Sequence, residues 1–449
     1  DEVPEATAAE VDAAVASAAE AFGAWRRVDA AERAGHLRAL ADAAEAAATE
    51  LVALLTREQG KPTLEAQGEL RHFLGGLRYY AEAATKVRGT YQELPSQFGP
   101  AYGLVVRRPI GVVGAITPWN FPLTLLGNKL GPALAAGNTV VAKPAETTPL
   151  TTLRLAELLH AGGLPAGVVN VVTGTGPVAG DALVRHPRVR KVAFTGSTAV
   201  GRRTMAAAAE HLKRVTLELG GSDPMIICDD ADLDRAVSAA SVGRFFNCGQ
   251  ACLATKRLFV FERVADEVVE RLVAKASRLR VGPGTAEGVQ MGPLHSARQR
   301  ALIEEQVADA VDRGATVLCG GARPQGDVYD RGFFYQPTLL LEPPPGARVA
   351  VEETFGPVLP IWRVGGLDEA IERANDSPYG LGSAIWTRDL HRASLAAERL
   401  EAGYTWVNSI NKVYDELPFG GLKQSGYGKE HGIEALDYYQ ETKSVVVRH

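Results

Sequence analysis

Roughly the first eighty residues carry apolar positions at the three- and four-residue spacing of helices that bury one face. Alanine-rich segments over residues 11–25 and 33–61 show this period. The second segment ends at Gly60, Lys61 and Pro62, a run that stops a helix. We therefore predict packing helices along this stretch.

Short apolar runs then alternate with helical stretches. Strands and helices that follow one another in this order are typical of a parallel sheet covered by helices, so the pattern predicts an α/β fold. The runs lie at residues 111–116, 138–143, 167–172, 191–196 and 224–228.

A second alternating set follows the first. It has apolar runs at residues 257–262 and 315–321 and helical periods at 265–279 and 296–313. We interpret this set as a second α/β domain.

The composition is that of a large globular protein. The chain has 449 residues, of which 46% are hydrophobic and 22% are charged, which is enough for two or three domains. The formal net charge is only -5 and no run rich in Lys and Arg occurs, so we expect no nucleic-acid partner. No apolar stretch reaches the roughly 18 residues of a membrane span, and the start lacks the features of a signal peptide. We expect a cytoplasmic protein with small-molecule chemistry and no membrane partner.

The four cysteines raise the question of whether a sulfur reacts, binds metal or packs. Cys228, Cys248, Cys252 and Cys319 are too few for a disulfide framework, and the nine histidines show no ligand-like spacing beside them. Three residues separate Cys248 from Cys252, instead of the two of a CxxC redox motif. We predict no metal site, and from the residues alone a packing cysteine and a nucleophile remain equal alternatives.

Two glycine-rich turns follow predicted strands, at residues 174–180 and 196–201. Neither has the spacing of the dinucleotide motif GxGxxG, and the second lacks the lysine of a phosphate-binding P-loop. Taken alone, each is better interpreted as a tight turn between a strand and a helix. The second turn could still place Ser197 and a helix N-terminus near a pyrophosphate.

Seven short motifs occur in order along nearly the whole chain. They are ITPWNFP (116–122), KPAE (143–146), FTGS (194–197), LELGG (217–221), FFNCGQAC (245–252), EETFGPV (352–358) and PFGGLKQSGYG (418–428). As a set they resemble the NAD(P)-dependent aldehyde dehydrogenase superfamily, and seven collinear motifs are far more specific than any one of them. Members of that family usually carry a β-hairpin ahead of the first helix, whereas this sequence opens at that helix.

The resemblance implies the aldehyde dehydrogenase fold, an α/β architecture of three parts. A Rossmann-like NAD-binding domain is expected over residues 1–88 and 109–219, and an α/β catalytic domain over 220–425. Residues 89–108 and 426–449 are expected to form a small β oligomerisation element, because turn-punctuated strands of this kind often pair across subunits. We expect a homodimer or a homotetramer.

The resemblance also assigns the chemistry to three residues. Cys252 matches the family nucleophile, whereas Cys248 falls at a position where the family varies. A thiolate adds readily to an aldehyde carbon, and the thiohemiacetal can release hydride to become a thioester. Asn120 matches the residue whose amide binds the oxyanion together with the backbone N–H of Cys252. Glu218 matches the general base that activates water, and its two leucine neighbours favour a raised pKa.

The cofactor contacts carry over in the same way. Lys143 and Glu146 match the pair that binds the adenosine ribose, Ser197 faces the pyrophosphate, and Glu353 matches the ligand of the nicotinamide ribose. A carboxylate at Glu146 would repel a 2′-phosphate, so we expect NAD as cofactor, with NADP accepted but less preferred. Further cofactor contacts are expected from Ile116, Trp119, Gly196, Leu219, Gly220 and Phe355.

The substrate is expected to be an aldehyde whose class depends on two tunnel positions. Relatives that act on carboxylated semialdehydes, such as succinate semialdehyde, often place arginines where this sequence has Phe246 and Asn128. Phe246 and Phe121 instead favour an apolar, aromatic or ammonium-bearing aldehyde. The run GGSDP resembles semialdehyde enzymes and the segment SGYGKE resembles aminoaldehyde and betaine-aldehyde enzymes, so both alternatives stay open.

Two other functions are less well supported. A CoA-acylating enzyme would release its thioester to CoA and generally does not need the water-activating Glu218. A catalytically silent binding protein would not need Cys252, Glu218 and Asn120 together.

Overall fold

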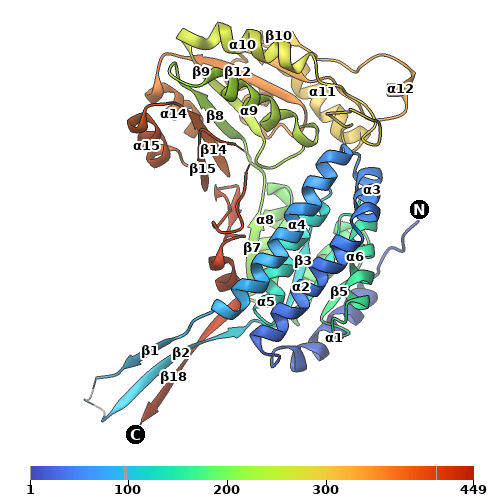
Figure 1. Ribbon diagram of the computed structural model, residues 1–449, viewed down its shortest axis with the longest axis vertical. Helices are drawn as coiled ribbons and strands as arrows, with labels where there is room; N and C mark the ends of the chain where they lie inside the picture. The colour runs from blue at the N-terminus through green and yellow to red at the C-terminus, as the bar shows by residue number, and fades with distance from the viewer. Residues whose placement is uncertain (1, 96, 98, 411, 449) are drawn as a thin grey trace.

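The structure is a computed structural model that describes residues 2–95, 97, 99–410 and 412–448. It consists of two α/β bodies and a three-stranded ribbon that projects away from them (Figure 1). None of the described helices is both long and apolar enough to cross a membrane.

The first body is built on a six-stranded sheet. Its strands are β3 (Val112–Ile116), β4 (Thr139–Lys143), β5 (Val169–Val171), β6 (Val189–Thr195), β7 (Arg214–Glu218) and the short β17 (Gly426–Tyr427). The order is β17-β7-β6-β3-β4-β5, and all pairs except the antiparallel β17·β7 are parallel. The chain winds outward from β3 in both directions, as in a Rossmann sheet, which confirms the expected fold class.

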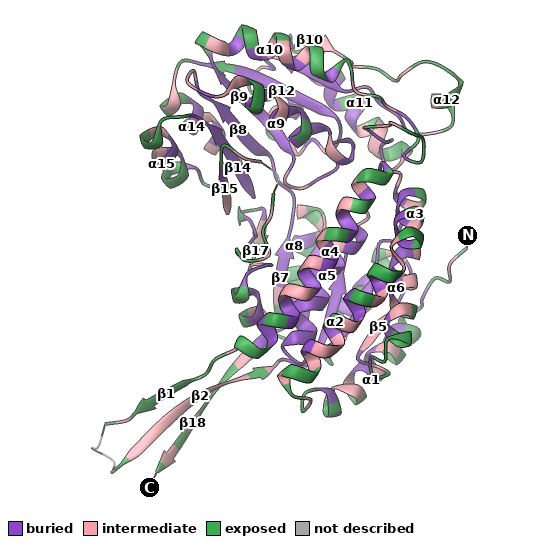
Figure 2. Ribbon diagram, in the orientation of Figure 1, coloured by how far each residue is buried: buried purple, intermediate pink, exposed green. Residues whose placement is uncertain are grey.

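Helices cover both faces of this sheet. They are α1 (Ala8–Trp25), α2 (Ala30–Ala46), α3 (Ala48–Gln59), α4 (Thr63–Ala83), α5 (Pro122–Ala135), α6 (Leu150–Ala161), α7 (Asp181–Arg185) and α8 (Thr198–Ala209). Because successive strand residues point to opposite sides, Val113 and Val140 pack under α2 to α6, whereas Val112 and Val141 pack under α1, α7 and α8. Figure 2 shows the sheet buried between these layers.

The second body is built on a seven-stranded sheet. Its strands are β8 (Asp223–Ile227), β9 (Thr255–Phe261), β10 (Thr316–Cys319), β11 (Thr338–Leu341), β12 (Val358–Val364), β14 (Gly382–Trp386) and β15 (Tyr404–Val407). The order is β10-β11-β12-β9-β8-β14-β15, with only the edge strand β10 antiparallel. Its helices are α9 (Leu233–Phe245), α10 (Glu262–Ala276), α11 (Ala297–Asp312), α12 (Asp327–Asp330), α13 (Arg348–Val351), α14 (Leu367–Asn375) and α15 (Leu390–Arg399).

Two details of the predicted elements are wrong. The apolar pattern groups the run at 224–228 with the first sheet, but this run forms β8 of the second sheet, between β9 and β14, inside the 220–425 bounds expected for the catalytic domain. The pattern misleads here because apolar runs of one length look alike whichever sheet they join. The predicted helix over 33–61 is two helices, α2 and α3, which meet at the non-helical Ala47. The predicted helix stop is confirmed, since Gly60 caps α3 with a left-handed φ of 99°.

The ribbon consists of β1 (Thr90–Glu93), β2 (Ala101–Pro109) and β18 (Gln440–Arg448). β2 pairs antiparallel with both others, so the chain's last described strand lies beside a segment more than three hundred residues earlier. Most of the ribbon's residues are exposed or half-buried (Figure 2). Another two-stranded pairing joins β13 (Tyr379–Gly380) to β16 (Leu422–Lys423).

Candidate active site

A cavity of about 270 Å³ lies where the two bodies meet. From the first body it is lined by segments that follow β3, β6 and β7. The chain reverses its winding between β3 and β6, and the crevice outside the carboxyl ends of such strands is where open α/β sheets bind ligands. The second body contributes Cys252, Glu353 and Phe355 to the same cavity.

Cys252 follows a strained loop. The loop begins with the 3₁₀ turn Phe246–Gly249, in which Asn247 and Cys248 have left-handed φ values of 49° and 56°. Lys256 donates from Nζ to the carbonyl oxygen of Cys252 and pairs with the Oε1 of Glu353 at 3.2 Å. Burial raises the pKa of the Cys252 thiol to about 12, although the charge of Lys256 acts in the opposite direction.

Asn120 lines the cavity beside Cys252. Its Nδ2 donates to the carbonyl oxygen of Gln250 at 3.0 Å, while Asn247 Nδ2 donates to the carbonyl oxygen of Asn120 at 3.0 Å. The loop after β3 is thereby tied to the loop of the cysteine. One N–H of the Asn120 amide stays available to a ligand.

Glu218 is the last residue of β7, in register with Thr195 of β6 and Gly426 of β17. The side chain is buried, and neither carboxylate oxygen has a hydrogen-bond partner among the described residues. Burial, and next the negative charge of Glu430, raises the pKa of this carboxyl well above its usual range. Glu218 is not one of the described residues that line the cavity, but its neighbours Thr195 and Leu219 are.

The N-terminus of α8 opens onto the cavity through Gly196 and Ser197. Ser197 is the N-cap, and its hydroxyl accepts from the Val200 backbone N–H at 3.4 Å. Backbone N–H groups and the positive end of a helix dipole make such a terminus suited to phosphate.

Glu353 lines the same cavity as this terminus. Its Oε1 accepts from the Gly221 backbone N–H at 3.1 Å. A Cβ added to Gly220 would lie 2.3 Å from the Oε2 of Glu353, so a larger residue here would displace this carboxylate. Trp119 and Phe355 meet edge to face with ring centroids 5.6 Å apart and supply an apolar wall.

Lys143, Glu146 and Ile116 are not among the residues that line the cavity. Lys143 and Ile116 are register partners at the ends of β4 and β3. The Lys143 Nζ pairs with the exposed Glu146 at 3.6 Å and donates to the Pro144 carbonyl oxygen at 2.8 Å. Burial lowers the pKa of Lys143.

Phe121 and Phe246 stack on one another with centroids 5.5 Å apart and planes 17° apart. They do not line the cavity, but they flank Asn120 and Asn247 in the two loops that do approach it. The Nζ of Lys61 lies 4.1 Å from the centroid of the Phe121 ring.

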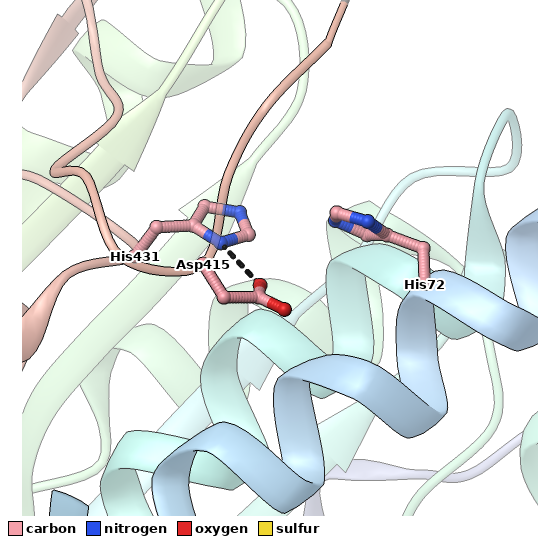
Figure 3. A group of neighbouring side chains, drawn as sticks. All are labelled: His72, Asp415 and His431. Carbon is pink, nitrogen blue, oxygen red and sulfur yellow. Dashed lines mark hydrogen bonds and ion pairs between the residues drawn. The ribbon is translucent and has the colours of Figure 1, made fainter.

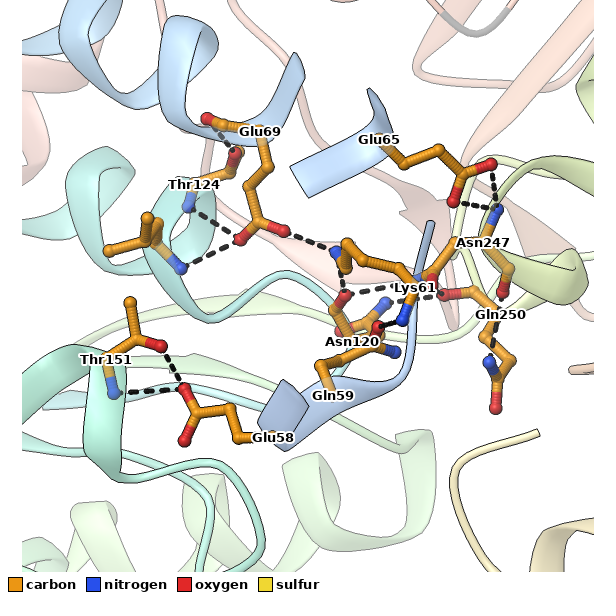
Figure 4. A network of polar contacts seen from close by, with 11 residues as sticks. Glu58, Gln59, Lys61, Glu65, Glu69, Asn120, Thr124, Thr151, Asn247 and Gln250 are labelled. Atoms are coloured by element: carbon orange, nitrogen blue, oxygen red, sulfur yellow. Dashed lines mark hydrogen bonds and ion pairs between the residues drawn. The ribbon is translucent and has the colours of Figure 1, made fainter. Parts of the chain in front are cut away.

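Sequence reasoning missed the polar network that holds these loops (Figure 4). Lys61, fully buried, pairs with Glu69 and donates to the Asn120 carbonyl oxygen at 2.8 Å. Arg244, also fully buried, donates to the carbonyl oxygens of Gly249 at 3.0 Å and Thr354 at 2.9 Å. Buried charges of this kind give no periodic pattern. Also missed were five cavity-lining residues: Pro118, Leu125, Thr195, Gln299 and Leu302.

Comparison with known proteins identifies the chain. A sequence model described as the aldehyde dehydrogenase family matches residues 1–445. The phenylacetaldehyde dehydrogenase of Pseudomonas fluorescens is 44% identical, over 99% of this chain and 90% of its own. The NADP(+) succinate-semialdehyde dehydrogenase of Escherichia coli (strain K12) is 42% identical, over 99% and 91%. The betaine aldehyde dehydrogenase of Staphylococcus aureus, solved with NAD+, has a TM-score of 0.96 at 36% identity, over 99% of this chain and 89% of its own.

A Rossmann-like sheet whose switch point opens onto a cavity with a half-buried thiol is an arrangement typical of a dehydrogenase. The chain belongs to the aldehyde dehydrogenase family. It is an NAD(P)-dependent oxidoreductase that acts on aldehydes.

Proposed function

We propose that Cys252, Asn120 and Glu218 carry the oxidation of an aldehyde to its acid. The observation that supports this most is that Cys252 and Asn120 line one cavity with the α8 N-terminus and Glu353. A dinucleotide and an aldehyde would therefore meet at the sulfur.

The roles follow from the chemistry of each group. The Cys252 thiolate adds to the aldehyde carbon, and the new oxyanion accepts hydrogen bonds from the Asn120 amide and the Cys252 backbone N–H. A bound NAD would supply the acceptor for the hydride of this carbon, and loss of that hydride would leave a thioester on Cys252. Glu218 takes a proton from water, and the water oxygen attacks the thioester carbon to release the acid and the thiolate. A raised pKa suits Glu218 to this step near neutral pH.

We propose NAD as the preferred cofactor. Lys143 and Glu146 bind the adenosine ribose, with Ile116 at the same sheet edge. Gly196 and Ser197 face the pyrophosphate, and Glu353 binds the nicotinamide ribose. Trp119, Leu219, Gly220 and Phe355 complete the walls around it.

We propose an apolar, aromatic or ammonium-bearing aldehyde as substrate. The stacked Phe121 and Phe246 support this, since an aromatic face attracts cations and accepts apolar groups. Asn128, the second position at which semialdehyde enzymes often carry arginine, is a buried residue of α5. The phenylacetaldehyde and betaine aldehyde relatives agree with this class, and the succinate-semialdehyde relative is the alternative.

We propose that the parts divide as NAD-binding domain (1–88 and 109–219), catalytic domain (220–425) and oligomerisation element (89–108 and 426–449). The projecting ribbon supports the last part, because β1 and β18 each pair only with β2 among the described residues. Such open edges favour pairing with a second copy. We propose a cytoplasmic homodimer or homotetramer.

An aldehyde panel followed by NADH or NADPH absorbance tests the substrate and cofactor together. Phenylacetaldehyde or betaine aldehyde should exceed succinate semialdehyde in kcat/KM, and NAD should exceed NADP. Added CoA should leave the rate unchanged. A tenfold advantage for succinate semialdehyde would contradict the substrate class, and equal efficiency with NADP would contradict the role of Glu146.

A further inference from the structure

Two histidines and an aspartate converge on one side of the molecule (Figure 3). His72 lies on α4, Asp415 in the loop after β15, and His431 just after β17. One ligand atom from each lies within 4.8 Å of the other two, and no other such group occurs among the described residues. Their separation in the chain explains why histidine spacing predicted no metal site.

The arrangement is held by packing as well as by its own contacts. The Nδ1 of His431 lies 3.0 Å from the Oδ1 of Asp415. The carboxylate sits against Gly75 and Gly76 of α4, where an added Cβ would lie 3.4 Å from Oδ2 and 3.6 Å from Oδ1 respectively. The Gly432 backbone N–H donates to the Asp415 carbonyl oxygen at 2.8 Å. Two loops are thus fixed on one helix at the point where the three side chains meet.

His72 is the one of these three side chains that these contacts do not hold. Its ring is 5.7 Å from the His431 ring, centroid to centroid, and the described residues supply no hydrogen bond to it. His431 has a left-handed φ of 57°, a conformation that non-glycine residues seldom adopt without a constraint.

We propose that His72, Asp415 and His431 form a binding site for a divalent transition-metal ion, with zinc as the best-matched ion. Two imidazoles and a carboxylate are a known ligand set for zinc, with water in the fourth position. Ligand atoms at about 2.0–2.2 Å from a tetrahedral zinc ion lie about 3.3–3.6 Å apart, so the widest separation of 4.8 Å must close by roughly 1.2–1.5 Å when the ion binds.

The ion would clamp α4 to the segment that surrounds the general base. His431 directly follows Glu430, whose carboxylate pairs with the buried Lys129 at 2.7 Å. The Phe419 and Glu430 backbones exchange two hydrogen bonds, and a Cβ on Gly420 would lie 2.5 Å from the Oε1 of Glu218. An ion bound at this site would therefore stabilise this segment without taking part in the reaction.

Zinc titration of the chelator-treated full chain tests the site. Calorimetry should show one equivalent bound, and zinc should raise the thermal unfolding midpoint. His72→Ala should weaken binding at least tenfold and abolish the zinc-induced rise. It keeps the His431 to Asp415 contact, so the metal-free midpoint should change little. His391→Ala, which removes an exposed histidine of α15, should bind as the unaltered chain does.

Cobalt substitution distinguishes this site from the cysteines. The bound Co²⁺ should show d–d bands without the intense near-ultraviolet band of a cobalt-thiolate bond. Failure to bind one equivalent, equal binding by His72→Ala, or a thiolate band that His72→Ala leaves unchanged would each overturn the proposal.

Discussion

Glu69 and Glu218 are both buried carboxylates, yet their surroundings are opposite. Glu69 pairs with Lys61 and accepts from the Leu123 and Thr124 backbone N–H groups at 2.8 and 3.3 Å. Glu218 has no hydrogen-bond partner among the described residues. A buried carboxylate whose charge is compensated by an ion pair and hydrogen bonds rigidifies the loops around it. A buried carboxyl without such partners has a raised pKa and can exchange a proton.

The contrast extends to the regions that contain them. In the network of Figure 4, Lys61 pairs with Glu69, and both Lys61 and Asn247 donate to the Asn120 carbonyl oxygen. Near the cavity, Glu218 and the Oδ1 of Asn120 are unpartnered among the described residues. Variants near the cavity should therefore lose activity and keep stability, and variants in the network should lose stability first.

Replacing the cavity thiol should have the largest effect. Cys252→Ala should abolish NADH formation, because no other group can form the thioester, while NAD binding stays nearly unchanged. Turnover and NAD affinity by fluorescence titration check both parts. Cys248→Ala is the matched control: that sulfur is buried in the core of the second body, and its loss should cost about 1 kcal/mol and little activity. Appreciable turnover by Cys252→Ala would refute the nucleophile.

Glu218→Gln should reduce steady-state turnover by roughly 10²–10⁴-fold. Thiol addition and hydride transfer remain, so rapid-quench kinetics should show one burst of NADH followed by slow turnover. In the unaltered chain the rate should rise with pH as Glu218 loses its proton, since a base acts when deprotonated and its pKa is raised. The variant should lose that rise. Loss of the burst itself would mean that Glu218 acts earlier, by taking the proton of Cys252.

Lys61→Met should destabilise the protein by about 3–5 kcal/mol, because it leaves Glu69 charged, buried and unpaired. Urea unfolding checks this value. The double variant Lys61→Met/Glu69→Gln should recover part of the loss, since the neutral amide oxygen can still accept from the α5 N-terminus. Arg271→Met, which removes the partner of the exposed Asp234, should cost less than about 1 kcal/mol. If Lys61→Met and Arg271→Met lowered the free energy of unfolding by equal amounts, the distinction between the buried network and the surface ion pairs would be wrong.

The fold was largely predictable because periodicity reports which side chains are buried. The strands at 112–116 and 139–143 lie within the predicted runs. Periodicity alone did not predict the sheet that residues 224–228 join, since strand pairing depends on contacts distant in the chain. The break at Ala47 was missed because alanine favours a helix and no proline or glycine marks the end.

The candidate site also has residues that the sequence predicts and residues that it does not. Cys252 and Asn120 stand in recognisable motifs, and the structure brings both to one cavity. Lys61 and Glu69 are two ordinary charged residues in sequence, and only their shared burial gives them a role. His72 and His431 lie far apart in the chain and so gave no ligand spacing.

Glu65 lies between the two regions and should give the smallest effect. Its two oxygens accept from the Asn247 backbone N–H at 3.2 and 3.0 Å, and burial raises its pKa to about 7. Between pH 4.5 and 7 the folded chain keeps a proton that the unfolded chain releases, so this carboxyl makes the protein less stable as pH rises through that window.

The variant Glu65→Gln removes this dependence of stability on pH. From pH 5 to pH 8 the free energy of unfolding of the variant, relative to the unaltered chain, should therefore increase by up to about 3 kcal/mol. Glu82→Gln, an exposed change on the same helix, should give a constant difference. If the stability difference between Glu65→Gln and the unaltered chain did not change with pH, the Glu65 charge would be as well compensated as that of Glu69. Glu65 and Asn247 would then both belong to the compensated network and not to the region near the cavity.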